Sequence, residues 1–146
     1  MKDVILTSFL TIIGGVLIFV LGQILLNLFI EPIQELRYHI GKIAGSLVFY
    51  ANVYGNPGVT AEQEQRNASD ELRKLASELI ARTAVVPLYR FACLISHLPS
   101  LSDIRKVHDN LIALSNNVFY TQEPTQVIQA NDKRVKEIKA ALKLPG

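Results

Sequence analysis

One run of the sequence decides most of what this chain can become: from Val4 to Ile30 there is no charged side chain. About 20 apolar residues are enough for a helix to cross the ~30 Å hydrocarbon core of a bilayer. A cleaved signal peptide has a shorter apolar core, about 7 to 15 residues, and ends at small residues. This run ends in Phe29-Ile30-Glu31-Pro32. It therefore predicts a transmembrane anchor, with the buried core helix of a soluble protein as the alternative.

The remainder of the chain has the size of one modest folding unit. The whole sequence is 49% hydrophobic, and its mean hydropathy of +0.25 is high for a soluble domain of this length. An apolar anchor accounts for that excess. We therefore predict a transmembrane anchor at residues 1–31 and a helical cytoplasmic domain at residues 32–146.

The charges bear on partners and on topology. The sequence has 15 Lys and Arg against 13 Asp and Glu, so charge alone leaves nucleic-acid binding unsupported. Arg37 and Lys42 follow the anchor, whereas only Lys2 and the amino terminus precede it. Basic residues favour the cytoplasmic side, and the single cysteine, Cys93, suits a reducing compartment. We expect the N-terminus outside and the domain in the cytoplasm.

The domain shows helical periodicity throughout. Apolar residues recur in alternating steps of three and four, which places them on one stripe of a helix. The first such stripe is Ile33, Leu36, Ile40, Ile43, Leu47, Tyr50 and Tyr54. Further stripes follow Thr60, Val86, Ser100 and Pro124, and no segment alternates with the period of two that is typical of strands. The fold class is predicted to be all-α: one N-terminal transmembrane helix and a small helical bundle.

Several residues predict where helices begin. Pro32 suits the first turn of a new helix, but it could equally be a kink in one continuous rod with the anchor. Thr60 with Gln63 predicts a capping box. Ser100 or Ser102 is expected to cap a later helix.

The sequence lacks the common motifs of catalysis and cofactor binding. It has no Gly-rich phosphate loop, no Cys and His spacing for zinc and no Gly-x-Ser-x-Gly elbow. Its histidines, His39, His97 and His108, fall on three different predicted helices. We therefore predict no metal site and no cofactor, and we interpret Cys93 as a small buried hydrophobe.

One pair of residues has a catalytic interpretation. Six residues, Phe91 to Ser96, separate Arg90 from His97, which places both near one face of a single helix. This spacing resembles the motif of HEPN ribonucleases. The resemblance implies that His97 handles protons while Arg90 stabilises charge on an RNA phosphate. Phe91 departs from the motif, in which a polar residue commonly follows the arginine. The alternative is a solvated Arg90 and an ordinary helix-end His97.

The same pair, combined with the anchor, resembles the HEPN-like membrane pore proteins that accompany type VI-B CRISPR systems in antiviral defence. More of the chain is similar to uncharacterised small single-pass bacterial membrane proteins. The segments that carry this second resemblance are Glu31-Pro32-Ile33, Tyr50 to Tyr54 with Asn56-Pro57-Gly58, Ala68 to Leu75, and Leu114-Ser115-Asn116. Together the resemblances imply the bacterial inner (cytoplasmic) membrane as the location.

The anchor itself carries two candidate contact faces. Ser8, Gly15 and Gly22 repeat every seven positions, with Thr11 nearby, and small residues let neighbouring helices approach closely. Gln23 and Asn27 form another face, and their amides seek partners in hydrocarbon. The alternative is that small residues are simply common in membrane helices and that both amides lie near the headgroups.

Three functions remain open from the sequence. The first is a membrane-anchored homo-oligomer that assembles through its transmembrane helix, with a pore or membrane effector as one form. The second is a membrane-tethered HEPN-like ribonuclease that uses Arg90 and His97. The third is a tethered adaptor that binds a protein through its apolar stripes. The lipid bilayer is the one partner common to all three.

Overall fold

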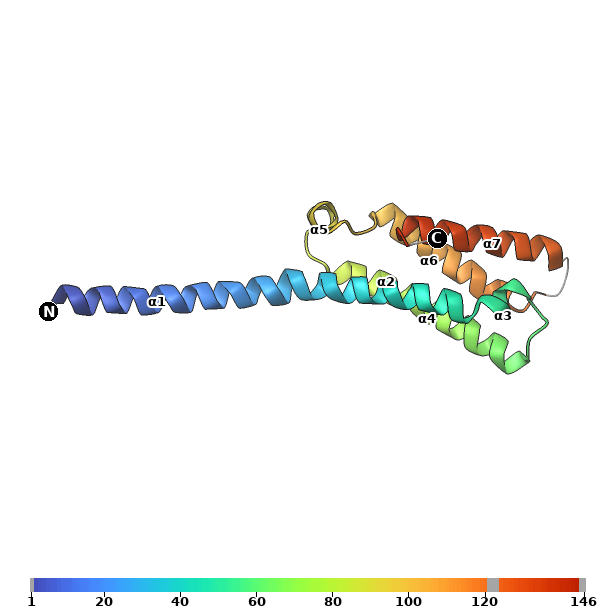
Figure 1. Cartoon of the computed structure of the whole chain (residues 1–146), viewed down its shortest axis with the longest axis horizontal. Helices are drawn as coiled ribbons and strands as arrows, with labels where there is room; N and C mark the ends of the chain where they lie inside the picture. The colour runs from blue at the N-terminus through green and yellow to red at the C-terminus, as the bar shows by residue number, and fades with distance from the viewer. Residues whose placement is uncertain (1, 121–123, 145–146) are drawn as a thin grey trace.

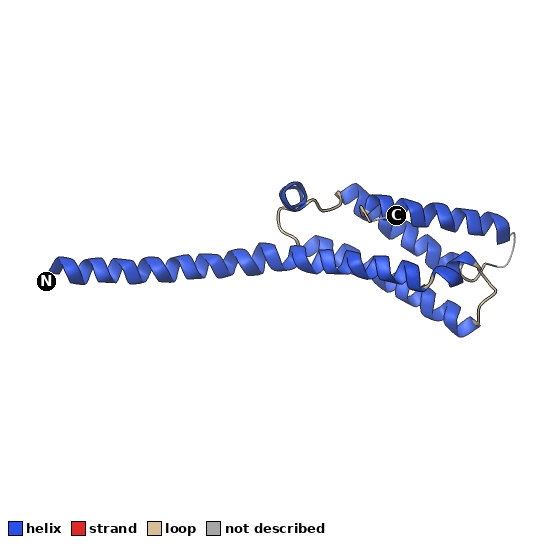
Figure 2. Cartoon of the chain, viewed as in Figure 1, coloured by secondary structure: helices blue, strands red, loops and turns tan. Residues whose placement is uncertain are grey.

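The computed structural model describes residues 2–120 and 124–144. Its longest feature is a single rod made of α1 (Lys2–Leu25), a π-helical turn (Leu26–Ile30) and α2 (Glu31–Phe49) (Figure 1). All regular structure in the described ranges is helical (Figure 2), so the predicted all-α class is confirmed. The rod also settles the question left open at Pro32, because the helix passes through it without ending.

The π turn has a physical cause in Pro32. Proline has no N–H to donate, and its ring crowds the carbonyl four residues earlier, here that of Leu28. In the structure, the N–H of Glu31 donates to the carbonyl of Leu26, five residues back. Widening this turn accommodates the proline ring while the rod stays continuous.

The second half of the rod is one wall of a four-helix bundle. Its other walls are α4 (Glu62–Val85), α6 (Leu101–Asn117) and α7 (Pro124–Ala141). α4 packs against α2 and α6, and α6 packs against α7. The predicted stripes supply the core, whose largest fully buried side chains include Leu36, Ile43, Leu47, Leu72, Leu75, Leu79, Ile104, Leu111, Leu114 and Ile138. The amphipathic pattern of this domain was therefore a correct guide to its packing.

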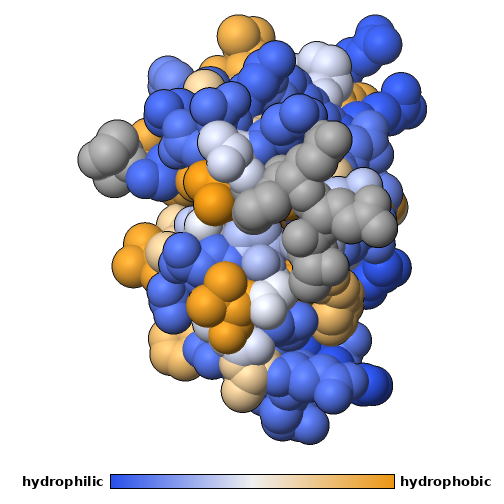
Figure 3. All heavy atoms as spheres, turned by 90° about the vertical axis from the view of Figure 1, so that its right-hand side faces the viewer, coloured by the Kyte–Doolittle hydropathy of each residue, from blue (hydrophilic) through white to orange (hydrophobic). Residues whose placement is uncertain are grey.

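Two short helices close the ends of the bundle. α3 (Ala51–Gly55) lies at the end far from α1, and α5 (Tyr89–Ser96) lies at the end where α1 leaves the bundle (Figure 1). The far end is mostly hydrophilic with separated apolar patches (Figure 3). The single helix predicted through Tyr54 is in fact two helices, α2 and α3, because the backbone leaves helical geometry at Tyr50.

The two capping predictions have opposite outcomes. Ser100 is confirmed as the N-cap of α6, in a capping box with Asp103. The capping box of Thr60 and Gln63 is wrong, because α4 begins at Glu62 after an extended Ala61 that offers no side-chain cap. The Thr60 carbonyl instead accepts a hydrogen bond from the Gln65 side chain at 2.7 Å.

A buried polar cluster ties α7 to the rest of the bundle. Asn131 is fully buried and donates from Nδ2 to the carbonyl of Tyr54 at 2.8 Å, while its Oδ1 accepts from Asn117 at 2.7 Å. The Tyr54 hydroxyl donates to the carbonyl of Leu47 at 2.6 Å. Burial, and then the nearby charge of Asp132, raise the pKa of Tyr54. These bonds fix the short α3 against α2 and α7.

Candidate functional site

The first half of the rod is uncovered by the rest of the chain. Within the helical stretch Val4–Phe49, the most apolar 18-residue window has 0% of its residues buried. The helix is long and apolar enough to cross a membrane. Its exposed side chains include Leu17, Ile18 and Phe19, which have no intramolecular core to join.

The predicted small-residue face of this helix is not covered at its glycines. A Cβ atom built on Gly15 or Gly22 would meet nothing within 4 Å, so either position can accept a neighbouring helix. Ser8 is exposed on the same helix. Thr11 is less available, because its hydroxyl already donates to the carbonyl of Thr7 at 2.9 Å. All four residues are exposed in the part of the chain that the structure describes.

Gln23 and Asn27 lie four residues apart, so their amides are neighbours on the helix surface. Together with Ile24 and Leu28 they line a shallow hollow of about 330 Å³. Neither side-chain amide has a hydrogen-bond partner among the described residues. Asn27 also belongs to the π turn, a feature that is frequent at functional sites. In hydrocarbon, such amides would need a partner from outside the chain.

Arg90 and His97 occupy different local structures. Arg90 is exposed in the first turn of α5, whereas His97 follows the last helical residue and has left-handed backbone, with φ of 52°. The expectation that a single helix presents both side chains is therefore corrected, because α5 ends at Ser96. Neither side chain makes a hydrogen bond or ion pair within the described part of the chain. Their use in a ribonuclease stays a prediction.

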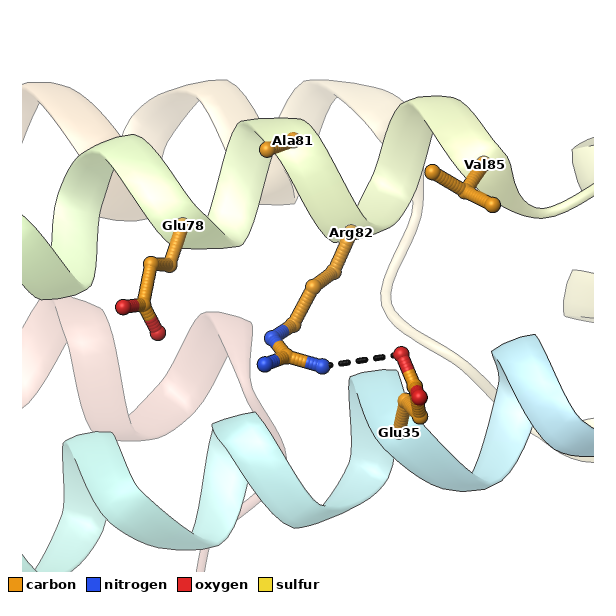
Figure 4. A pocket seen from close by; sticks show the side chains of 5 residues that line it. All are labelled: Glu35, Glu78, Ala81, Arg82 and Val85. Carbon is orange, nitrogen blue, oxygen red and sulfur yellow. Dashed lines mark hydrogen bonds and ion pairs between the residues drawn. The ribbon is translucent and has the colours of Figure 1, made fainter.

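A polar hollow between α2 and α4 was not found from the sequence (Figure 4). Arg82 Nη1 lies 2.9 Å from Glu35 Oε2 across the helix pair, and Glu78 lines the same hollow of about 330 Å³. The guanidinium is thus already paired, and a partly exposed ion pair contributes at most about 1 kcal/mol to stability. Glu35 and Arg82 are 47 residues apart in sequence, so only the folded chain brings them together.

His39 is buried behind this hollow. Its Nε2 lies 2.9 Å from the carbonyl oxygen of Leu75, which can only accept, so Nε2 carries the proton. Its Nδ1 lies 3.3 Å from Glu78 Oε2, but not in hydrogen-bonding geometry. The ion pair of Arg82 with Glu35 and the hydrogen bond from His39 to the Leu75 carbonyl both join α2 to α4 and so fix the register of the two helices. No hydroxyl or thiol nucleophile is among the residues that line it.

Cys93 is held by the loop that follows α5. Its Sγ donates to the carbonyl of Leu98 at 3.0 Å, and the side chain is half-buried. Beside it, the Tyr89 hydroxyl donates to the carbonyl of Pro99 at 2.8 Å, and burial raises the pKa of Tyr89 to about 12. Both groups hold α5 against the buried Leu98–Pro99 segment that leads into α6.

The described residues contain no group of three or more His, Cys, Asp or Glu side chains that could hold a metal ion. No protein-family model, curated protein or solved structure matches this chain. The family resemblances drawn from the sequence therefore gain no support from these comparisons. The class that the fold defines is an all-helical protein in which one uncovered apolar helix continues into a helical bundle.

Proposed function

We propose that this chain is a single-pass membrane protein of the bacterial inner membrane that associates with copies of itself through its anchor. The observation that carries the proposal is the division of one rod into an uncovered apolar half and a half built into the bundle. Because no loop separates the halves, the bundle is held rigidly next to the bilayer. The basic residues Arg37 and Lys42 follow the apolar run and favour a cytoplasmic bundle with the N-terminus outside.

Self-association is supported by two features of the anchor: open space at its glycines and side-chain amides without a hydrogen-bond partner among the described residues. Gly15 and Gly22 are open to close approach, and hydrogen bonds between membrane helices contribute about 0.6 to 2 kcal/mol each. Gln23 lies seven residues before Ile30, about 10 Å into the hydrocarbon at 1.5 Å per residue. There its amide gains by bonding to a second helix. With contacts on two faces, each helix can have two neighbours in a ring, and a ring can enclose a pore.

The mass of the detergent-solubilised particle tests this proposal. We expect the wild-type chain to be an oligomer and the Gly15→Leu/Gly22→Leu variant to run as a smaller particle. The control is Leu10→Val/Leu17→Val, which has the same spacing on another face and should keep the wild-type mass. A monomeric wild type, or a Gly15→Leu/Gly22→Leu variant of unchanged mass, would show that this face is not an interface. Conductance across planar bilayers then separates a pore from a closed assembly.

A reporter fused to the C-terminus tests the proposed topology. A reporter that works only in the cytoplasm should be active, and one that works only outside it should be silent. The reverse result would place the bundle outside and leave the anchor itself intact.

A further inference from the structure

We infer that α5 is an interfacial helix: its exposed apolar face docks on the surface of the same bilayer that holds the anchor. The inference rests on the proposed membrane anchoring and adds a second membrane-binding site within the folded domain. It concerns an interaction surface whose partner is lipid, at the boundary between headgroups and acyl chains. Amphipathic helices that bind there lie in the plane of the membrane and bury one face by about 5 to 10 Å.

The face of α5 that points away from the bundle is apolar. Around the helix, Tyr89 and Ala92 are buried against the bundle, and the opposite side is exposed. The exposed apolar side chains of this corner, with their exposed fractions, are Val85 67%, Leu88 70%, Phe91 60%, Leu94 77% and Ile95 62%. Three of these side chains, Phe91, Leu94 and Ile95, lie on α5 itself, and exposure of such a cluster to water is unfavourable.

The position of α5 along the rod matches the end of the apolar run. The ion pair of Arg82 with Glu35 places the last turn of α4 beside the start of the second turn of α2. Glu35 lies five residues beyond Ile30, about 7.5 Å along the axis. α4 runs back toward the anchor, so Val85 lies about 4.5 Å nearer to it than Arg82 does. The corner between α4 and α5 is therefore within a few Å of the level at which the charge-free run ends.

The orientation of α5 also fits a membrane surface. The chain turns by 101° between α4 and α5. Because α4 runs beside the rod, α5 lies across it, and it is seen nearly end-on in Figure 1. A helix perpendicular to a transmembrane rod lies parallel to the plane of the bilayer. The outer face of α5 is directed away from the bundle, at the end from which the anchor emerges.

Contacts at its C-terminal end hold α5 in this place. Arg37 from α2 donates to the carbonyl of Ser96, the last residue of α5, at 2.5 Å, and Lys143 donates to the carbonyl of His97, the next residue, at 3.4 Å. Left-handed backbone at Leu88 and His97 makes the two corners that turn the chain across the bundle. The exposed Arg90 lies at the edge of the apolar face, where its guanidinium can reach headgroup phosphates while the stem stays apolar.

The chain contains no tryptophan, so a single introduced tryptophan reports on one position. The full chain is reconstituted in vesicles of phosphatidylcholine and phosphatidylglycerol that contain brominated lipids, whose bromines quench fluorescence at known depth. Phe91→Trp and Leu94→Trp probe the face of α5. Phe49→Trp, at the far end of α2 and 78% exposed, is the solvent control, and Phe19→Trp probes the anchor.

We expect bromines near the headgroups to quench the Phe91→Trp and Leu94→Trp variants several-fold more strongly than Phe49→Trp, with blue-shifted emission. Quenching of Phe19→Trp without quenching at α5 would overturn the inference while the anchoring stands. Blue-shifted emission at α5 without quenching would also overturn it, since a second copy or another protein would then cover the face. Absence of quenching at Phe19→Trp would contradict the anchoring itself. Two α5 reporters, each checked by circular dichroism, keep the test decisive if one variant misfolds.

Discussion

The two halves of the long rod differ in how apolar side chains are arranged around the helix, although the helix is continuous. In residues 4–30 apolar side chains surround the helix, and none of the most apolar window is buried by the chain. In α2 one stripe of apolar side chains faces the bundle, and Leu36, Ile43 and Leu47 on that stripe are almost fully buried. A helix that is apolar all round needs an apolar solvent, whereas a striped helix needs only an apolar neighbour. The change occurs at the π turn beside Pro32.

The same substitution made in each half of the rod should have very different effects on stability. Ile43 in α2 is 0% exposed and Ile18 in the anchor is 74% exposed. We expect Ile43→Ala to lower the free energy of unfolding of the bundle by about 2 to 5 kcal/mol, because it leaves a cavity. Ile18→Ala should leave bundle stability unchanged. Denaturant unfolding in detergent, followed by circular dichroism, measures both, and equal losses would contradict the division of the rod.

A charged side chain should affect the first half of the rod and not the second. We expect Leu17→Arg to reduce membrane insertion of the anchor, because an arginine at the centre of a membrane helix costs about 2.5 to 3.5 kcal/mol on insertion scales. Tyr38→Arg, at an exposed position of α2, is the control and should insert like wild type. Extraction of membranes with alkaline carbonate measures the effect. Equal extraction of the two variants would mean that the first half of the rod does not sit in hydrocarbon.

The polar cluster at α7 gives a smaller effect confined to the bundle. We expect Asn131→Leu to cost about 1 to 3 kcal/mol of unfolding free energy, since Asn117 and the Tyr54 carbonyl lose a buried partner. The same substitution at Asn27 in the anchor should leave bundle unfolding unchanged. Chemical denaturation of both variants checks this. A neutral Asn131→Leu would show that water or other groups replace the lost bonds.

The raised pKa of Tyr89 predicts an alkaline pH dependence. Burial raises the pKa of Tyr89 from the ordinary tyrosine value of 10.0 to about 12, so the folded chain keeps the proton after the unfolded chain has released it. This contribution to stability is complete below pH 10 and is lost as pH rises toward 12. In Tyr89→Phe the unfolding free energy should fall less over that window than in wild type. Tyr38→Phe, at an exposed tyrosine, is the control, and an identical pH profile for Tyr89→Phe would contradict the assignment.

The smallest expected effect concerns Arg90 and His97. We expect the purified protein not to cleave single-stranded RNA, so the Arg90→Ala/His97→Ala variant should be indistinguishable from wild type in a cleavage assay. A thermal melt of the variant confirms that it is folded. Cleavage by the wild-type protein that the folded variant has lost would establish the ribonuclease hypothesis in place of ours.

The features that follow local periodicity were predictable. The charge-free run and the apolar stripes depend on residues a few positions apart, and the Ser100 cap depends on Asp103 three residues later. The Thr60 capping box failed because the chain enters α4 through an extended Ala61, a conformation that the motif does not encode. Pro32 was ambiguous because the same residue can begin a helix or be accommodated by a π turn.

The candidate sites also differ in whether local sequence spacing could predict them. The anchor faces could be proposed from sequence spacing, because every residue lies on one helix. The hollow of Glu35, Glu78 and Arg82 could not, since it joins helices from distant parts of the sequence. A weak signal was present: Glu35 with His39, and Glu78 with Arg82, stand four residues apart on their helices. The orientation of α5 depends on contacts with α2 and the C-terminal residues, which local patterns do not contain.

The central claim is that residues 4–30 lie in the bilayer and that the rod leaves it before α2. Labelling of single cysteines with a membrane-impermeant maleimide tests this most directly, in a Cys93→Ser background where the serine hydroxyl can keep the bond to the Leu98 carbonyl. In intact vesicles with the bundle facing outward, we expect Tyr38→Cys to be labelled rapidly and Phe19→Cys to be labelled only after the protein is denatured. Equal labelling of Phe19→Cys and Tyr38→Cys in intact vesicles would contradict the account.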